Sequence, residues 1–159
     1  MFVLLRHLQR VRREAALPPR SGARSLAVRH LDAGSCNACE HELTATAAPQ
    51  YDLARFGIGI VASPRHADVL LVTGPVTKRM EGPLRRAYEA MPEPRLVAAL
   101  GDCALGCGVL GDRAELAAPL EELLPVAIRI PGCPPSPEQI AEGLLTVVRA
   151  PLDPPAGRR

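Results

Sequence analysis

Aromatic residues and long hydrophobic runs are scarce in this sequence. Tryptophan is absent, and phenylalanine and tyrosine bring the aromatic fraction to only 3%. This scarcity argues against a module that stacks nucleic-acid bases on aromatic side chains. A formal net charge of +2 is also small for a nucleic-acid binder, so we expect no nucleic-acid partner. No run reaches the roughly 18 apolar residues that cross a membrane, so the sequence predicts no membrane span.

The remaining composition is that of one folded domain with a basic head. The chain has 159 residues, of which 47% are hydrophobic and 23% charged, which is enough apolar mass for a core. Residues 1–30 contain seven arginines and one glutamate, whereas the rest of the chain carries a net charge of −4. We expect residues 1–24 to form a basic amphipathic helix and a linker, residues 25–149 the folded domain, and residues 150–159 a flexible tail.

The basic head has two interpretations. Leu4, Leu5, Leu8 and Val11 recur at helical spacing between arginines, so the helix docks either on a protein or on a membrane surface. Arg6 and His7 interrupt the apolar run, and no small-residue cleavage site follows directly, which does not fit a secretory leader. We therefore expect a reducing, cytoplasmic setting.

Short apolar runs alternate with helical stretches through the domain. The expected strands are 25–31, 56–61, 67–73, 95–101 and 126–130. The expected helices are 37–48, 76–91, 113–124 and 137–149. Continuously apolar strands separated by helices predict a mostly parallel sheet that is covered on both faces. The expected fold is a three-layer α/β domain of flavodoxin-like type.

The five cysteines follow three of the expected strands. Cys36 and Cys39 follow the first strand, Cys103 and Cys107 follow the fourth, and Cys133 follows the fifth. Ligand sites in open α/β sheets lie at the carboxyl ends of the strands, so we expect all five thiols at one edge. An odd number of cysteines does not fit a closed set of disulfides, and a reducing setting favours metal or redox work.

Four thiolates can hold either zinc or an iron–sulfur cluster. Structural zinc usually binds two short cysteine pairs, whereas here one C-x2-C pair is followed by two single, distant cysteines. That split arrangement favours a cluster facing a partner. Zinc, and buried or reactive thiols without metal, stay open as alternatives at this point.

Five motifs appear in a fixed order in this chain. They are CNACEHEL (36–43), RFGI (55–58), SPRHADVLLVTGPV (63–76), GDCA (101–104) and IPGCPPSPE (130–138). Together they resemble the 20 kDa subunit family of NADH:quinone oxidoreductase, and within it the small subunit of membrane-bound nickel–iron hydrogenases of the formate hydrogenlyase type. The resemblance covers roughly residues 28–148.

The resemblance implies one 4Fe–4S cluster, held by Cys36, Cys39, Cys103 and Cys133. Relatives in respiratory complex I have adjacent cysteines at the first pair, whereas C-x2-C is the hydrogenase-like form. It also implies an electron-transfer subunit that is not catalytic alone. Its expected partners are a large subunit with nickel–iron or a quinone pocket, a ferredoxin-like iron–sulfur subunit and membrane-arm subunits. The expected location is peripheral, on the cytoplasmic face of the inner membrane.

Three further residues have weaker interpretations. Arg65 either places a cation near the cluster or caps a surface loop, and the matching stretch in complex I relatives lies near the quinone pocket. Glu42 is a candidate proton relay, although a carboxylate is favourable at a helix N-terminus in any case. Cys107 stands where the hydrogenase-like pattern has glycine. It is either a small buried thiol or an additional ligand or redox-sensitive thiol.

Two other functions compete with electron transfer. One is a zinc-stabilised scaffold subunit without redox activity. The other is a redox sensor that forms a disulfide through Cys107. The sequence contains no Walker A loop, no dinucleotide-binding fingerprint and no nucleophile elbow, so we expect neither NAD binding nor independent turnover.

Overall fold

The computed structural model describes residues 25–109 and 114–149. Both ranges belong to one compact unit. The helix and linker predicted for residues 1–24 and the tail predicted for 150–159 lie outside the described residues, so the division into head, domain and tail stays a prediction.

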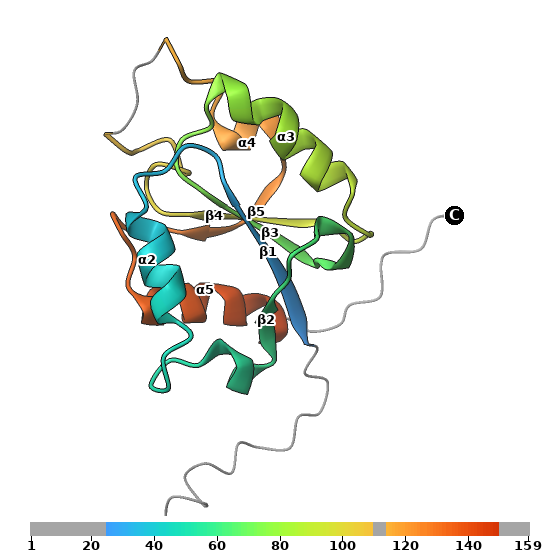
Figure 1. The fold of residues 1–159 in the computed structure, drawn as a ribbon, viewed down its shortest axis with the longest axis vertical. Helices are drawn as coiled ribbons and strands as arrows, with labels where there is room; N and C mark the ends of the chain where they lie inside the picture. Colours follow the sequence, from blue (N-terminus) through green and yellow to red (C-terminus); the bar gives the residue numbers. More distant parts are fainter. Residues whose placement is uncertain (1–24, 110–113, 150–159) are drawn as a thin grey trace, which may run out of the picture. The chain divides into compact units, whose positions relative to one another are not determined.

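Five parallel strands form the sheet. They are β1 (Leu26–Asp32), β2 (Ile58–Ile60), β3 (Val69–Thr73), β4 (Leu96–Leu100) and β5 (Val126–Ile130). Their order in the sheet is β2-β1-β3-β4-β5, and every neighbouring pair runs parallel (Figure 1). This is the flavodoxin-like order, in which the strand order reverses between β1 and β3. The predicted fold class is confirmed.

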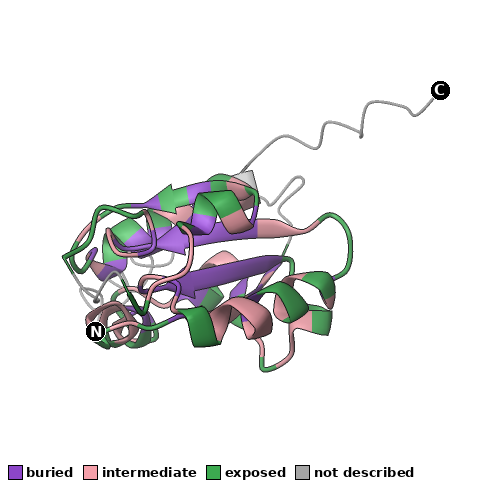
Figure 2. Cartoon of the chain, turned by 90° about the horizontal axis from the view of Figure 1, so that it is seen from above, coloured by how far each residue is buried: buried purple, intermediate pink, exposed green. Residues whose placement is uncertain are grey.

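Helices cover both faces of this sheet. Helices α2 (Ala38–Ala45) and α5 (Pro137–Arg149) lie on one face, and α3 (Lys78–Glu89) and α4 (Leu120–Leu123) lie on the other (Figure 1). All five residues of β3 are buried, because its side chains enter the cores on the two faces alternately. Figure 2 shows this buried central layer between partly exposed helices. A sheet buried on both faces explains why the strands read as continuous apolar runs.

Helix α5 has the bounds that the sequence predicts. The Ser136 amide donates to Gln139 Oε1 at 2.8 Å, and the Gln139 amide donates to Ser136 Oγ at 3.3 Å. This reciprocal pair is a capping box, and Pro137 occupies the first helical position, where its missing N–H costs nothing. The helix therefore begins immediately after the loop that contains Cys133.

The predicted helix 113–124 is wrong for most of its length. Only Leu120–Leu123 are helical, and the described residues before them are extended or turned. The Lys78 amide donates to Glu115 O at 2.9 Å, and the Ala117 amide donates to Val76 O at 2.8 Å. These hydrogen bonds flank an antiparallel bridge between Thr77 and Leu116, so this segment pairs with residues 76–78 in place of forming a helix. Pro119 then sets the start of the short helix.

Two short 3-10 helices complete the fold, η1 (Leu53–Phe56) before β2 and η2 (Pro64–His66) before β3. Across residues 25–109 and 114–149, no helix is both long enough and apolar enough to cross a bilayer.

Candidate metal centre

The carboxyl edge of the sheet contains a recess at the ends of β1, β3, β4 and β5. Four of the five cysteines line it together with small and conformationally restricted residues. The lining residues are Ser35, Cys36, Ala38, Cys39, Gly74, Asp102, Cys103, Gly132, Cys133 and Pro134. The four thiols are separated by up to 97 positions in the sequence but converge because parallel strands end at the same edge. All five cysteines are described, and none is in a disulfide.

The first cysteine loop is shaped by the carboxylate at the end of β1. Asp32 Oδ1 accepts hydrogen bonds from the Gly34 amide at 2.8 Å and from the Ser35 amide at 2.7 Å. Burial by itself would raise the pKa of Asp32. The hydrogen bonds from Ser35 and Gly34 together lower it by more, so the pKa of Asp32 lies below its usual value. The carboxylate thus turns the chain immediately before Cys36, and α2 then presents Cys39 one turn later.

The loops that contain Cys103 and Cys133 are joined to each other. The Asp102 amide donates to Gly132 O at 2.9 Å, and the Gly132 amide donates to Asp102 Oδ1 at 2.7 Å. Each of these residues directly precedes a cysteine in the sequence. The pair therefore fixes Cys103 relative to Cys133. Sequence reasoning did not assign this role to Asp102.

Glycine is required where the chain passes close to the sulfurs. Gly101 has φ +86°, and a Cβ there would lie 2.6 Å from Cys39 Sγ. A Cβ on Gly108 would overlap the sulfur of Cys103. A real Cβ in either place would displace a thiol from the recess, so both glycines preserve the positions of the sulfurs.

The thiols also interact electrostatically. Burial is the main factor that raises the pKa of Cys39, to about 11, and the nearby Glu40 carboxylate and the other three recess cysteines raise it further. Mutually repelling thiolates need a cationic centre to be held together, since a metal deprotonates the thiols that coordinate it. Sulfur donors select zinc or iron–sulfur centres, so the donor set of the recess fits the predicted cluster and also fits zinc.

A tight mononuclear arrangement is not formed. Among the residues that the structure describes, no three His, Cys, Asp or Glu side chains are drawn together closely enough to surround one metal ion. The four thiols line one recess, but they are spaced more widely than the ligands of a single metal ion.

A largely buried cluster of three polar side chains, Glu40, Thr73 and His30, lies between the first turn of α2 and the sheet. Thr73 Oγ1 donates a hydrogen bond to Glu40 Oε1, and His30 Nε2 lies 2.9 Å from Thr73 Oγ1 and 3.5 Å from Glu40 Oε1. Burial lowers the pKa of His30 below its ordinary value, although Glu40 and Asp32 oppose this effect. The sequence motifs had indicated Glu42 as a candidate proton relay and gave no role to Glu40 or His30. No local pattern indicated the pairing, because it depends on how β1, β3 and α2 meet.

The other predicted site residues do not line the recess. Arg65 is exposed on η2, where the chain approaches β3, whereas the recess lies where β3 ends. Glu42 is partly buried on α2. Cys107 is exposed, and its thiol lies 3.8 Å from Leu105 O, so the interpretation of Cys107 as a small buried thiol is wrong. The additional-ligand or redox role of Cys107 and the roles suggested for Arg65 and Glu42 stay predictions.

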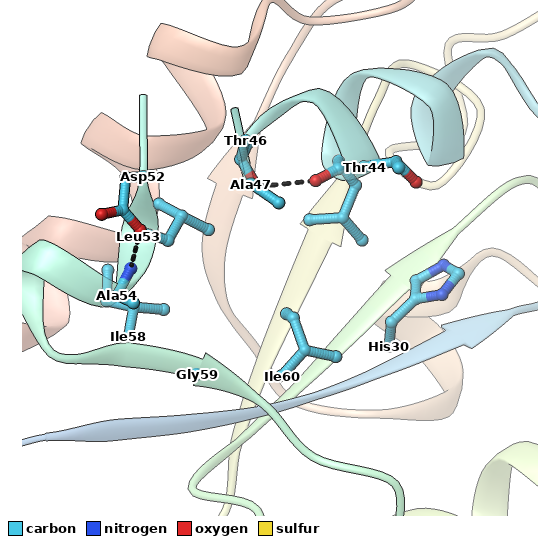
Figure 3. A pocket seen from close by; sticks show the side chains of 11 residues that line it. His30, Thr44, Thr46, Ala47, Asp52, Leu53, Ala54, Ile58, Gly59 and Ile60 are labelled. Atoms are coloured by element: carbon cyan, nitrogen blue, oxygen red, sulfur yellow. Dashed lines mark hydrogen bonds between the residues drawn. The ribbon is translucent and has the colours of Figure 1, made fainter. Parts of the chain in front are cut away.

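A larger cavity of about 430 Å³ lies between η1, β2 and the second half of α2 (Figure 3). Three of its polar side chains are hydrogen-bonded to backbone groups nearby in the sequence. Thr44 Oγ1 donates to Glu40 O at 2.8 Å, Thr46 Oγ1 donates to Leu43 O at 2.6 Å, and Asp52 Oδ1 accepts from the Ala54 amide at 3.2 Å. The thiol recess is the better candidate for chemistry, because four side chains of one metal-ligating type line it.

The fold and the recess define a flavodoxin-like α/β protein with four convergent thiols at the carboxyl edge of its sheet. The chain belongs to the NADH ubiquinone oxidoreductase 20 kDa subunit family, whose model matches residues 36–147 and so includes all four recess cysteines. The resemblance inferred from the motifs is confirmed.

Relatives come from hydrogenase and respiratory complexes. The chain is 46% identical over 122 residues to the "probable membrane-bound hydrogenase subunit mbhJ" of Pyrococcus furiosus, covering 77% of this chain and 73% of that protein. It is 44% identical over 114 residues to formate hydrogenlyase subunit 7 of Escherichia coli, covering 72% of this chain and 45% of that protein. A chain in the solved structure of the membrane-bound sulfane sulfur reductase, an archaeal respiratory membrane complex, superimposes with a TM-score of 0.68. It is 32% identical, and the match covers 79% of this chain and 70% of that chain.

Proposed function

We propose that this chain is an electron-transfer subunit that carries one 4Fe–4S cluster on Cys36, Cys39, Cys103 and Cys133. The observation that carries the proposal is the convergence of these four thiols, from three separate loops, in one recess at the sheet edge. Among the described residues that line the recess, Asp102 is the one ionisable side chain besides the cysteines, and its Oδ1 accepts a hydrogen bond from the Gly132 amide. The four sulfurs are therefore the main metal donors of the recess.

A bound cluster would supply one-electron redox chemistry. The residues of the chain hold and orient the thiols. Asp32 shapes the loop before Cys36, α2 presents Cys39, and Asp102 fixes the spacing between the loops of Cys103 and Cys133. Cys36 and Cys133 are exposed, so the recess opens to the surface, where a partner subunit can approach closely enough for electron transfer.

We further propose that the chain works within a membrane-associated complex of the hydrogenase or NADH:quinone oxidoreductase type. The names of its relatives support this assignment, since they include subunits of a membrane-bound hydrogenase and of formate hydrogenlyase. The proposed partners are a large subunit with nickel–iron or a quinone pocket, a ferredoxin-like iron–sulfur subunit and membrane-arm subunits. The proposed location is peripheral, on the cytoplasmic face of the membrane.

The test is metal analysis of the full chain purified without oxygen. We expect about four irons and about four acid-labile sulfides per chain, with a visible absorbance that dithionite bleaches. Replacing each recess cysteine by serine removes a ligand, so each of the four variants is expected to lose most of its iron. Cys107→Ser is the matched control and is expected to keep the wild-type iron content, because Cys107 does not line the recess.

A colourless chain that holds one zinc ion would overturn the electron-transfer function and establish the scaffold alternative. Loss of iron in Cys107→Ser together with full retention in one recess variant would instead change the assignment of the ligands.

A further inference from the structure

The side chain of Glu40 is attached to the sheet by two residues from neighbouring strands. His30 and Thr73 lie on β1 and β3, which pair side by side with His30 opposite Leu71 and Asp32 opposite Thr73. Because side chains alternate along a strand, His30 and Thr73 project on the same face as Val28 and Leu71, which is the face covered by α2. Glu40 reaches this face from the first turn of α2.

The three groups form an ordered chain of hydrogen bonds. Thr73 has no exposed surface, and the side chains of His30 and Glu40 are only 22% and 19% exposed. The single hydroxyl proton of Thr73 is donated to Glu40 Oε1, so His30 Nε2 must be the donor to Thr73 Oγ1. This order defines the tautomer of His30 and holds the carboxylate in one orientation.

Helix α2 has few other attachments near its start. Its N-cap residue, Asn37, is in the left-handed conformation and makes no side-chain capping bond, and Leu43 is the only buried residue of the helix. The first turn contains Cys39, which is adjacent to Glu40 and packs against the core beneath the helix. The Glu40 side chain is therefore the polar contact that ties this turn to the sheet, whereas the hydrogen bond from the Asn37 amide to Ser35 Oγ is local to the loop.

We propose that Thr73 and His30 are positioning residues that hold Glu40, and that Glu40 in turn sets the orientation of Cys39 and places a negative charge beside the cluster. This inference rests on the proposed function. Glu40 directly follows Cys39 in α2, and its side chain is only 19% exposed, so solvent screens its negative charge only weakly from the Cys39 sulfur. Reduction makes a cluster more negative, so Glu40 lowers its reduction potential.

Two substitutions separate position from charge, using the full chain with its cluster. Thr73→Val keeps the charge of Glu40 but removes its hydrogen-bond donor. We expect altered EPR g-values of the reduced cluster in this variant, and restoration of the wild-type spectrum in Thr73→Ser, which retains the hydroxyl. Glu40→Gln keeps an oxygen that accepts from Thr73 but removes the charge. We expect a nearly wild-type spectrum and a reduction potential shifted upward in a redox titration.

Glu42→Gln is the matched charge control, since it removes the same charge from the same helix two residues further on. Its upward shift is expected to be smaller than that of Glu40→Gln. Wild-type spectra in Thr73→Val, or equal potentials in Glu40→Gln and wild type, would overturn the inference and leave the proposed function intact. If Thr73→Val does not fold, Thr73→Ala replaces it, because it also removes the hydroxyl that donates to Glu40 Oε1, and a wild-type spectrum there overturns the inference equally. Absence of iron from the wild-type chain would overturn both.

Discussion

Asp102 and Gly132 form a reciprocal hydrogen-bonded pair between two loops that are 30 residues apart in the sequence. The Gly132 amide donates to Asp102 Oδ1 at 2.7 Å, and the Asp102 amide donates to Gly132 O at 2.9 Å. β4 and β5 already pair side by side, and this contact continues their pairing beyond the end of the sheet. Cys103 and Cys133 therefore follow a rigid extension of the two strands.

The first prediction concerns this pair. Asp102→Ala removes the acceptor of the Gly132 amide, and leaving a partly buried donor unsatisfied typically costs about 1–3 kcal/mol. We expect urea denaturation to show a loss of unfolding free energy in that range, together with reduced iron content. Asp102→Asn retains a side-chain oxygen and is expected to lose less in both measurements. Equal stability and equal iron in Asp102→Ala and wild type would show that the backbone alone positions the loops.

The second prediction concerns the glycine that touches Cys39. Gly101→Ala introduces a Cβ 2.6 Å from Cys39 Sγ at a residue with φ +86°. A non-glycine residue in the left-handed region costs about 1–2 kcal/mol, and the displaced sulfur adds to this cost. We expect Gly101→Ala to be less stable in denaturant and to lose most of its iron.

Gly106→Ala separates the two effects, because Gly106 has φ +78° and nothing within 4 Å of an added Cβ. This variant is expected to lose stability by the conformational cost alone and to keep its iron. Comparable loss of iron in both variants would mean that the contact with Cys39 Sγ is unimportant.

The third prediction is a pH dependence that arises from His30. Burial lowers the pKa of His30 from its ordinary value of 6.5, against the opposing effects of Glu40 and Asp32 and with a small contribution from Arg29. The unfolded chain therefore takes up this proton at a higher pH than the folded chain does. The unfolding free energy is at its plateau above pH 6.5 and decreases as the pH falls toward the lower pKa of the folded state.

His30→Gln can still donate to Thr73 but does not titrate. We expect urea unfolding of this variant between pH 7 and 5 to show a smaller decrease in stability than that of the wild type. One group contributes at most about 1.4 kcal/mol per pH unit. Parallel stability curves for the two proteins would show that His30 does not contribute.

Most of the fold could be predicted from short local patterns. The strand Val126–Ile130 and the helix Pro137–Arg149 have the expected bounds. Proline follows the strand directly, and Ser136 with Pro137 marks the start of the helix. The expected helix 113–124 failed because its backbone pairs with residues 76–78, which are distant in the sequence. Such long-range hydrogen bonds cannot be predicted from the helix propensity of residues 113–124 alone.

The candidate site was likewise predictable from the sequence only in part. That the thiols gather at one edge follows from strand order, since each cysteine follows a strand of a parallel sheet. The roles of Glu40 and Asp102 could not be predicted, because each depends on a contact between separate elements. The i,i+2 spacing of Glu40 and Glu42 on a helix gives no indication of which one faces Thr73, and only the rotation of α2 against the sheet decides it.

The last prediction concerns removal of the cluster. The core does not depend on the recess, because β3 is buried along its whole length and apolar clusters fill both faces of the sheet. Stripping iron from the full chain with ferricyanide and a chelator is therefore expected to leave the far-UV circular dichroism nearly unchanged. Amide hydrogen exchange is expected to accelerate in residues 101–108 and 131–136, where the loops lose the metal–sulfur bonds that hold them together, and much less in β3. Cooperative unfolding of the whole sheet upon iron removal would contradict this independence and would make the cluster a structural requirement of the fold.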